Sequence, residues 1–131
     1  MAGATVLLID DDEDFTAAIR SLLESEGYAV VTAGSGREGL RKLRESSPDV
    51  VLLDVIMEST TEGYAVSGAI KLAEVQVPVI MLSSVERAPD ELFARSEETE
   101  LIRPNAYVTK PVDVPKFLET LRSVLGQHAR A

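Results

Sequence analysis

The stretch Asp49-Val50-Val51-Leu52-Leu53-Asp54 runs through four apolar residues and ends in an acid. An unbroken apolar run of this length is typical of a strand that is buried on both faces of a parallel sheet. The carboxyl ends of such strands form the edge at which open α/β sheets bind their ligands. We therefore expect a strand over 49–53 that delivers the Asp54 carboxylate to this edge.

Two other apolar runs end in charged residues in the same way. The run over 7–9 leads into five consecutive acids, Asp10 to Asp14, and the run over 106–109 leads into Lys110. If these runs are strands of the same parallel sheet, the acids, Asp54 and Lys110 converge at one edge. Carboxylates suit a divalent cation, and a lysine suits a carboxylate or a phosphate.

A simpler interpretation of these charges remains open. Acids at a strand-to-helix connection cap the helix and interact favourably with its dipole, which needs only one or two of them. A lysine after a strand is commonly solvated. Pro111 restricts Lys110 to extended geometry and allows a cis peptide bond between the two residues.

Composition limits the classes of function. The chain has 131 residues, 45% of them hydrophobic, and a formal net charge of −9, which argues against direct binding to nucleic acid or to an anionic membrane. Cysteine is absent, so disulfides and thiolate metal sites are excluded. No apolar run is long enough for a membrane span, and we expect a cytoplasmic protein with one domain, its core over 5–126 and a tail over 127–131.

Strands and helices alternate along the chain. Strands are expected over 5–9, 28–32, 49–53, 78–82 and 106–109, and helices over 15–26, 36–44, 64–75 and 114–125. The stretch 85–105 is polar and contains Pro104, so the fourth helix region is expected to be atypical. This order predicts an α/β fold with a doubly wound five-stranded parallel sheet, a (βα)5 flavodoxin-like arrangement.

One motif in the second strand–helix unit points elsewhere. Gly34-Ser35-Gly36-Arg37-Glu38-Gly39 fits the dinucleotide pattern G-x-G-x-x-G. That fingerprint belongs to the first unit of a nucleotide-binding fold, whereas this one opens the second. We therefore do not expect nucleotide binding here.

Five segments in order resemble the motifs of the receiver domain of two-component response regulators: 7–12, 32–40, 51–57, 78–84 and 106–111. The resemblance implies that Asp54 accepts a phosphoryl group. It implies Mg²⁺ as the cofactor, held by Asp10, Asp11, Asp54 and the backbone carbonyl of Ile56. It also implies that Lys110 and Ser83 bind the phosphoryl group, and that Ser83 and Tyr107 act as switch residues.

The same resemblance implies a signalling domain rather than an enzyme, with self-catalysed phosphotransfer from a histidine kinase or phosphotransfer protein and a downstream protein target. It leaves a homodimer open. Two alternatives remain. A Mg²⁺-dependent phosphohydrolase usually has a second acid two residues after its nucleophile, where this chain has Ile56. A degenerate receiver that acts only as an interaction module would not need the acids and Lys110, which are all present.

Overall fold

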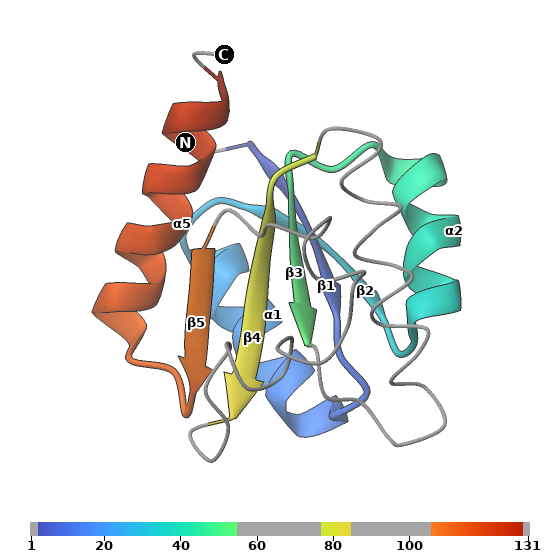
Figure 1. Ribbon diagram of the computed structural model, residues 1–131, viewed down its shortest axis with the longest axis horizontal. Helices are drawn as coiled ribbons and strands as arrows, with labels where there is room; N and C mark the ends of the chain where they lie inside the picture. The colour runs from blue at the N-terminus through green and yellow to red at the C-terminus, as the bar shows by residue number, and fades with distance from the viewer. Residues whose placement is uncertain (1–2, 55–76, 85–105, 130–131) are drawn as a thin grey trace, which may run out of the picture.

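A single parallel sheet carries the apolar runs of the sequence (Figure 1). The computed structural model describes residues 3–54, 77–84 and 106–129. Its strands are β1 (Thr5–Ile9), β2 (Ala29–Ala33), β3 (Val50–Asp54), β4 (Val79–Ser84) and β5 (Ala106–Lys110), in the spatial order β2-β1-β3-β4-β5. This is the flavodoxin-like order, so the predicted fold class is confirmed.

Helix α1 (Glu13–Ser25) begins two residues before the expected start because Asp12 is its N-cap. The Asp12 carboxylate accepts hydrogen bonds from the amides of Asp14 and Phe15, at 3.0 and 3.1 Å. The helix ends before Gly27, whose φ of 92° is the left-handed conformation that glycine adopts without strain.

Helix α5 (Val114–Ala129) is longer than expected. The sequence predicted a frayed tail from residue 127, but the helix continues through Gly126 to Ala129. Val124 and Leu125 are buried against the sheet, so the preceding turn is held in place by packing. Adding residues to a helix that is already nucleated is far easier than starting one, which explains the extension.

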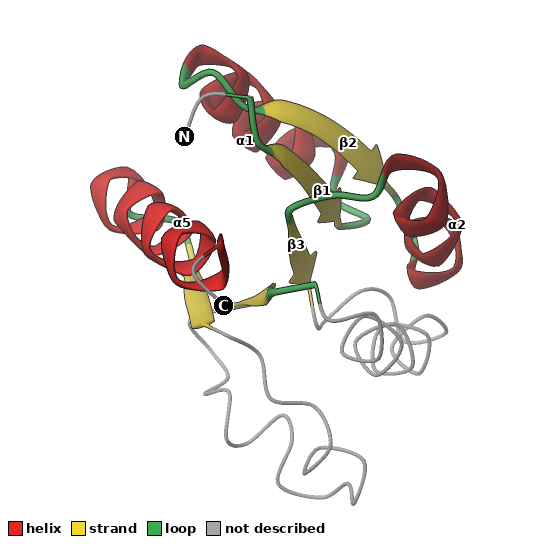
Figure 2. Ribbon diagram, turned by 90° about the horizontal axis from the view of Figure 1, so that it is seen from above, coloured by secondary structure: helices red, strands yellow, loops and turns green. Residues whose placement is uncertain are grey.

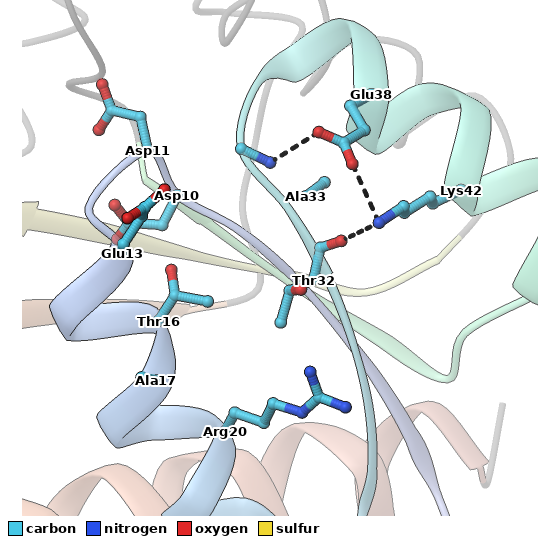
Figure 3. Close-up of a pocket in the computed structure, with 11 residues that line it drawn as sticks. Asp10, Asp11, Glu13, Thr16, Ala17, Arg20, Thr32, Ala33, Glu38 and Lys42 are labelled. Atoms are coloured by element: carbon cyan, nitrogen blue, oxygen red, sulfur yellow. Dashed lines mark hydrogen bonds and ion pairs between the residues drawn. The ribbon is translucent and has the colours of Figure 1, made fainter.

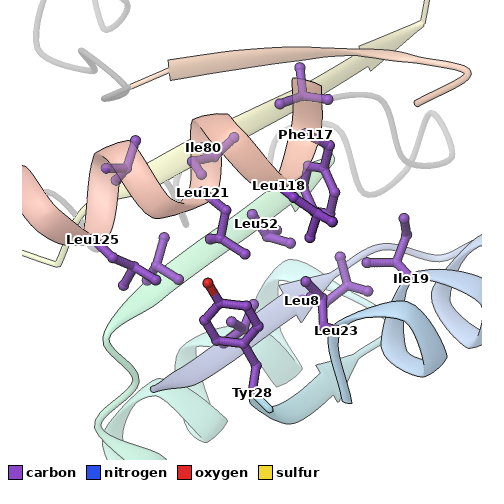
Figure 4. Close-up of a cluster of buried hydrophobic side chains, with 14 of the residues drawn as sticks. Leu8, Ile19, Leu23, Tyr28, Leu52, Ile80, Phe117, Leu118, Leu121 and Leu125 are labelled. Carbon is purple, nitrogen blue, oxygen red and sulfur yellow. The ribbon is translucent and has the colours of Figure 1, made fainter. Parts of the chain in front are cut away.

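The main hydrophobic core lies between the sheet and the two helices α1 and α5, which cover the same face (Figure 2). It is formed by every second strand residue together with the inner faces of these helices (Figure 4). The largest contributors from β1, β3 and α5 are Leu8, Leu52, Phe117 and Leu121, all at most 1% exposed. Because the alternate strand residues are buried on the opposite face, β1 is apolar from Val6 onward and β3 is apolar up to Leu53.

Helix α2 (Gly36–Ser46) covers the opposite face of the sheet. Gly39 allows this close approach, since a Cβ atom at this position would lie 2.4 Å from Cδ1 of Ile9. Ser35 caps the helix by accepting a hydrogen bond from the Glu38 amide at 3.2 Å. The glycine motif in this region therefore serves helix–sheet packing, as close packing is one of its roles in any βα unit.

The expected helix over 64–75 and the atypical region over 85–105 lie outside the described residues. Within the described part of the chain, no helix is long and apolar enough to cross a membrane.

Candidate functional site

Strand register places two carboxylates side by side at the centre of the sheet. Ile9 of β1 pairs with Leu53 of β3, so Asp10 and Asp54 follow at the same level of neighbouring strands. Their exposed fractions are 3% and 4%, and they are the only buried charged residues found in the described ranges. Burying two like charges together is costly unless a cation neutralises them.

Lys110 supplies positive charge from the end of β5. Its Nζ atom lies 2.8 Å from Oδ2 of Asp10 and 3.1 Å from Oδ2 of Asp54, and its side chain is 21% exposed. The ammonium also lies 4.1 Å from the centre of the Phe15 ring in α1, a favourable cation–π distance. The peptide bond between Lys110 and Pro111 is cis.

The surroundings of Lys110 change its proton affinity in two directions. Burial lowers its pKa, whereas the hydrogen bond to Asp10 and the negative charges of Asp54 and Asp10 raise it, and the net pKa lies above its ordinary value of 10.5. Lys110 is therefore a permanent cation at neutral pH. One positive charge for two carboxylates leaves the group with residual negative charge.

A third carboxylate completes a cluster that could hold a metal ion. One oxygen each of Asp10, Asp11 and Asp54 lie within 4.8 Å of one another. Carboxylate oxygens are the ligands that Mg²⁺ and Ca²⁺ prefer, and the excess negative charge favours a divalent cation over a neutral occupant. The donor set of the described residues therefore fits Mg²⁺.

The remaining acids of the 10–14 cluster serve the helix. Asp12 is the N-cap of α1, while Glu13 and Asp14 lie in the first turn, where the helix dipole favours negative charge. The Asp12 amide also donates a hydrogen bond to Oδ1 of Asp10 at 2.9 Å, which leaves Oδ2 of Asp10 for Lys110. The helix interpretation is therefore confirmed for Asp12, Glu13 and Asp14, whereas metal binding by Asp10 and Asp11 stays a prediction.

A hollow of about 530 Å³ opens beside the carboxylates, between α1 and the β2–α2 connection (Figure 3). Asp10, Asp11 and Glu13 line one end of it, and Lys42 of α2 lies at the other. The Lys42 ammonium forms an ion pair with Oε1 of Glu38 at 3.0 Å and donates a hydrogen bond to the carbonyl oxygen of Thr32. The carboxylate cluster is therefore reachable from solvent through this hollow, on the side where Asp11 lies.

Other predicted site residues are placed only in part. The backbone of Ser83 is opposite Thr109, and that of Tyr107 is opposite Met81, but their side chains lie outside what the structure describes. Ile56 is also outside the described residues. Sequence reasoning missed the Phe15 ring beside Lys110, because the helical periodicity at Phe15 indicated only a core-facing position.

Comparison with known proteins gives consistent results. A sequence profile described as "Response regulator receiver domain" matches residues 6–122. The polar-differentiation response regulator DivK of Brucella ovis is 33% identical over 124 residues, which cover 93% of this chain and 96% of that protein. The uncharacterized transcriptional regulatory protein YkoG of Bacillus subtilis is 32% identical over 128 residues, 98% of this chain but 54% of that protein.

Solved structures show the same architecture. The chemotaxis protein CheY4 of Vibrio cholerae superposes with a TM-score of 0.76 at 29% identity, over 94% of this chain and 99% of that one. A CheY-like receiver domain protein of Methanospirillum hungatei superposes with a TM-score of 0.83 at 23% identity, over 98% of each chain, which supports the fold alone.

Proposed function

Because this chain belongs to the response regulator receiver family of two-component signalling, we propose that Asp54 is its phosphoacceptor and that phosphorylation switches a protein–protein interaction. The observation that carries the proposal is the buried Asp54 carboxylate, paired with Lys110 at 3.1 Å and next to two further aspartates. A histidine kinase or phosphotransfer protein would be the donor, and we place the reaction in the cytoplasm.

The residues present fit a direct phosphoryl transfer. An Oδ atom of Asp54 attacks the phosphorus, the new O–P bond forms as the P–N bond to the donor histidine breaks, and the imidazole leaves with the electron pair and takes up a proton. Asp10, Asp11 and Asp54 would hold Mg²⁺, with the carbonyl of Ile56 as a further proposed ligand. When bound, the ion supplies positive charge that offsets the charge on the transferring oxygens.

Lys110 would hold the phosphoryl group after transfer. In the structure its ammonium is divided between Asp10 and Asp54, and a phosphoryl oxygen beside Asp54 offers a stronger negative partner. Its raised pKa keeps it charged throughout the physiological range. The transfer thus changes the charge that Lys110 faces at the end of β5, and we propose that Ser83 and Tyr107 respond to that change.

The decisive experiment is phosphorylation with a small acyl phosphate donor and Mg²⁺, read by intact mass. We expect one added phosphoryl group on the wild type and none on Asp54→Asn. The matched control is Asp49→Asn, which alters an exposed carboxylate that accepts a hydrogen bond from the Thr5 amide at 2.7 Å, away from the cluster. Labelling that persists in Asp54→Asn would move the acceptor to another residue and overturn the proposal.

A further inference from the structure

Helix α2 presents a line of arginines to solvent. Arg37, Arg41 and Arg44 are all exposed and are spaced i, i+4 and i+7, which places them on one side of the helix over about 10 Å of its length. The inner side, with Gly36, Gly39 and Leu43, faces the sheet. We refer to these three arginines as the arginine stripe.

The stripe stands out from the charge of its surroundings. Residues 3–54 outside α2 contain nine acids and one basic residue, Arg20, whereas α2 contains four basic residues and two acids. The whole chain carries −9. The positive charge of the stripe is therefore local. At physiological salt it acts on a charged partner only over about 8 Å, the screening length.

Helix stability accounts for only part of the stripe. Arg37 lies in the first turn, where a cation opposes the helix dipole. Arginines four and three residues apart repel one another, and the glycines of α2 already weaken its helical propensity. Glu45 approaches Arg41 at 4.0 Å, but both side chains are 66% exposed, so this pair contributes little. Only Arg44, which lies in the last turn, has a favourable position with respect to the helix dipole.

We propose that the arginine stripe docks an acidic helical segment of another protein. A helix with glutamates at i, i+4 and i+7 presents three carboxylates over the same length of about 10 Å, one for each guanidinium. Arginine binds carboxylates through two parallel hydrogen bonds, which favours it over lysine at such contacts. Half-buried Leu40 lies between Arg37 and Arg44 on one flank of the stripe and offers an apolar contact.

The spacing disfavours the other anionic partners. A nucleic acid duplex carries about six charges over 10 Å of its axis, twice the number of arginines in the stripe. The excess phosphates would face a chain of net charge −9, and an extended anionic membrane would meet the same repulsion. A short acidic helix avoids this penalty because its charge ends where the stripe ends.

The test is a titration of the isotope-labelled full chain with a synthetic helix carrying glutamates at i, i+4 and i+7, followed by NMR. We expect chemical-shift changes confined to 36–46 and affinity that falls as salt increases. Replacing the stripe with R37Q, R41Q and R44Q should weaken binding about tenfold. Replacing Glu45 with Gln should strengthen it, because a competing carboxylate is removed.

A matched control separates the stripe from net charge. The triple variant R20Q, K116Q and R122Q removes three exposed cations from α1 and α5 and changes the net charge equally. It should bind the peptide within about twofold of wild type. The stripe variant should also unfold at a temperature close to that of wild type, since substitutions of exposed residues usually change stability little.

Several outcomes would overturn the proposal. Equal loss of binding in both triple variants would reduce the effect to overall charge. Tighter binding of a duplex DNA or of vesicles with anionic phospholipid than of the peptide would assign the stripe to those partners. A salt-sensitive dimer that the stripe variant abolishes, seen by sedimentation, would make the occupant a second copy of this chain. Absence of shifts in α2 would leave the stripe as a solvated face.

Discussion

Two lysines of this protein each bind two oxygen acceptors, but they draw them from different distances along the chain. Lys110 joins Asp10 and Asp54, which are 100 and 56 residues away. Lys42 joins Glu38 on the preceding turn of α2 and the carbonyl oxygen of Thr32, ten residues away. The first set of partners meets only when four strands, β1, β3, β4 and β5, assemble, whereas the second belongs to one strand–helix unit.

The two neighbourhoods also differ in burial. Both carboxylates beside Lys110 have side chains at most 6% exposed, whereas the side chains of Lys42 and Glu38 are 27% and 37% exposed. Water can replace a partner more readily at the local pair than at the buried one. The proposed phosphoacceptor, Asp54, therefore lies where charge is both buried and assembled from distant strands, and variants at the two lysines can separate this kind of charge from a local one.

The largest effect is expected from Lys110→Met. Removing the cation leaves two buried carboxylates in mutual repulsion, so the free energy of unfolding should fall by about 3 kcal/mol in metal-free buffer. Phosphorylation of Asp54 should slow at least about 100-fold, as for the loss of one electrostatic contact to a developing charge. Denaturant unfolding and intact mass measure the two effects. Full stability in the variant would contradict the strain inferred at the cluster.

Divalent cations should substitute in part for that missing charge. With Mg²⁺ at ten times its dissociation constant, wild type should gain about 1.4 kcal/mol of stability. The gain should shrink in Asp11→Asn and grow in Lys110→Met, because in the second variant the metal offsets negative charge that Lys110 no longer neutralises. Thermal unfolding with Mg²⁺ and with a chelator measures the difference, and Asp49→Asn serves as the control. A gain that is unchanged in Asp11→Asn would place the ion elsewhere.

The pH dependence of stability should separate the two neighbourhoods. Because the pKa of Lys110 is raised above 10.5 in the folded state, its contribution is complete below pH 10.5 and is lost as the pH rises through the folded pKa. The hydrogen bonds from Lys42 and Gly34 lower the pKa of Glu38 below 4.5, so its contribution is present above that pH and is lost as the pH falls through the folded pKa.

Difference curves between wild type and each variant isolate these effects. Lys110→Met should remove part of the alkaline loss of stability, and Glu38→Gln should remove a smaller part of the acid loss. Urea unfolding across both pH ranges provides the measurement. If the loss of stability at alkaline pH were unchanged in Lys110→Met, the ion pairs of Lys110 would not contribute to the stability of the wild type in that pH range.

The sequence predicted that Asp10, Asp54 and Lys110 come together, but it did not predict the individual contacts around them. The apolar runs ending in Asp10, Asp54 and Lys110 were sufficient to place the three groups at one edge, because parallel strands align their carboxyl ends. The five adjacent acids gave no means of choosing Asp12 as the N-cap, since the four aspartates among them have the same capping chemistry. The packing of Phe15 against Lys110 depends on how α1 lies on the sheet, which no local pattern specifies.

The contact between Lys42 and Thr32 was equally hidden, and it gives the smallest expected effect. Thr32 lies on β2, an edge strand, so its carbonyl oxygen can bind water once Lys42 is replaced. Lys42→Gln should therefore lower the free energy of unfolding by less than about 1 kcal/mol and leave phosphorylation within about twofold of wild type. The free energy of unfolding of Lys42→Arg, which keeps the charge, should lie between the values of wild type and Lys42→Gln. If Lys42→Gln lost as much free energy of unfolding as Lys110→Met, burial and assembly from distant strands would not determine how much a charged residue contributes to the stability of this fold.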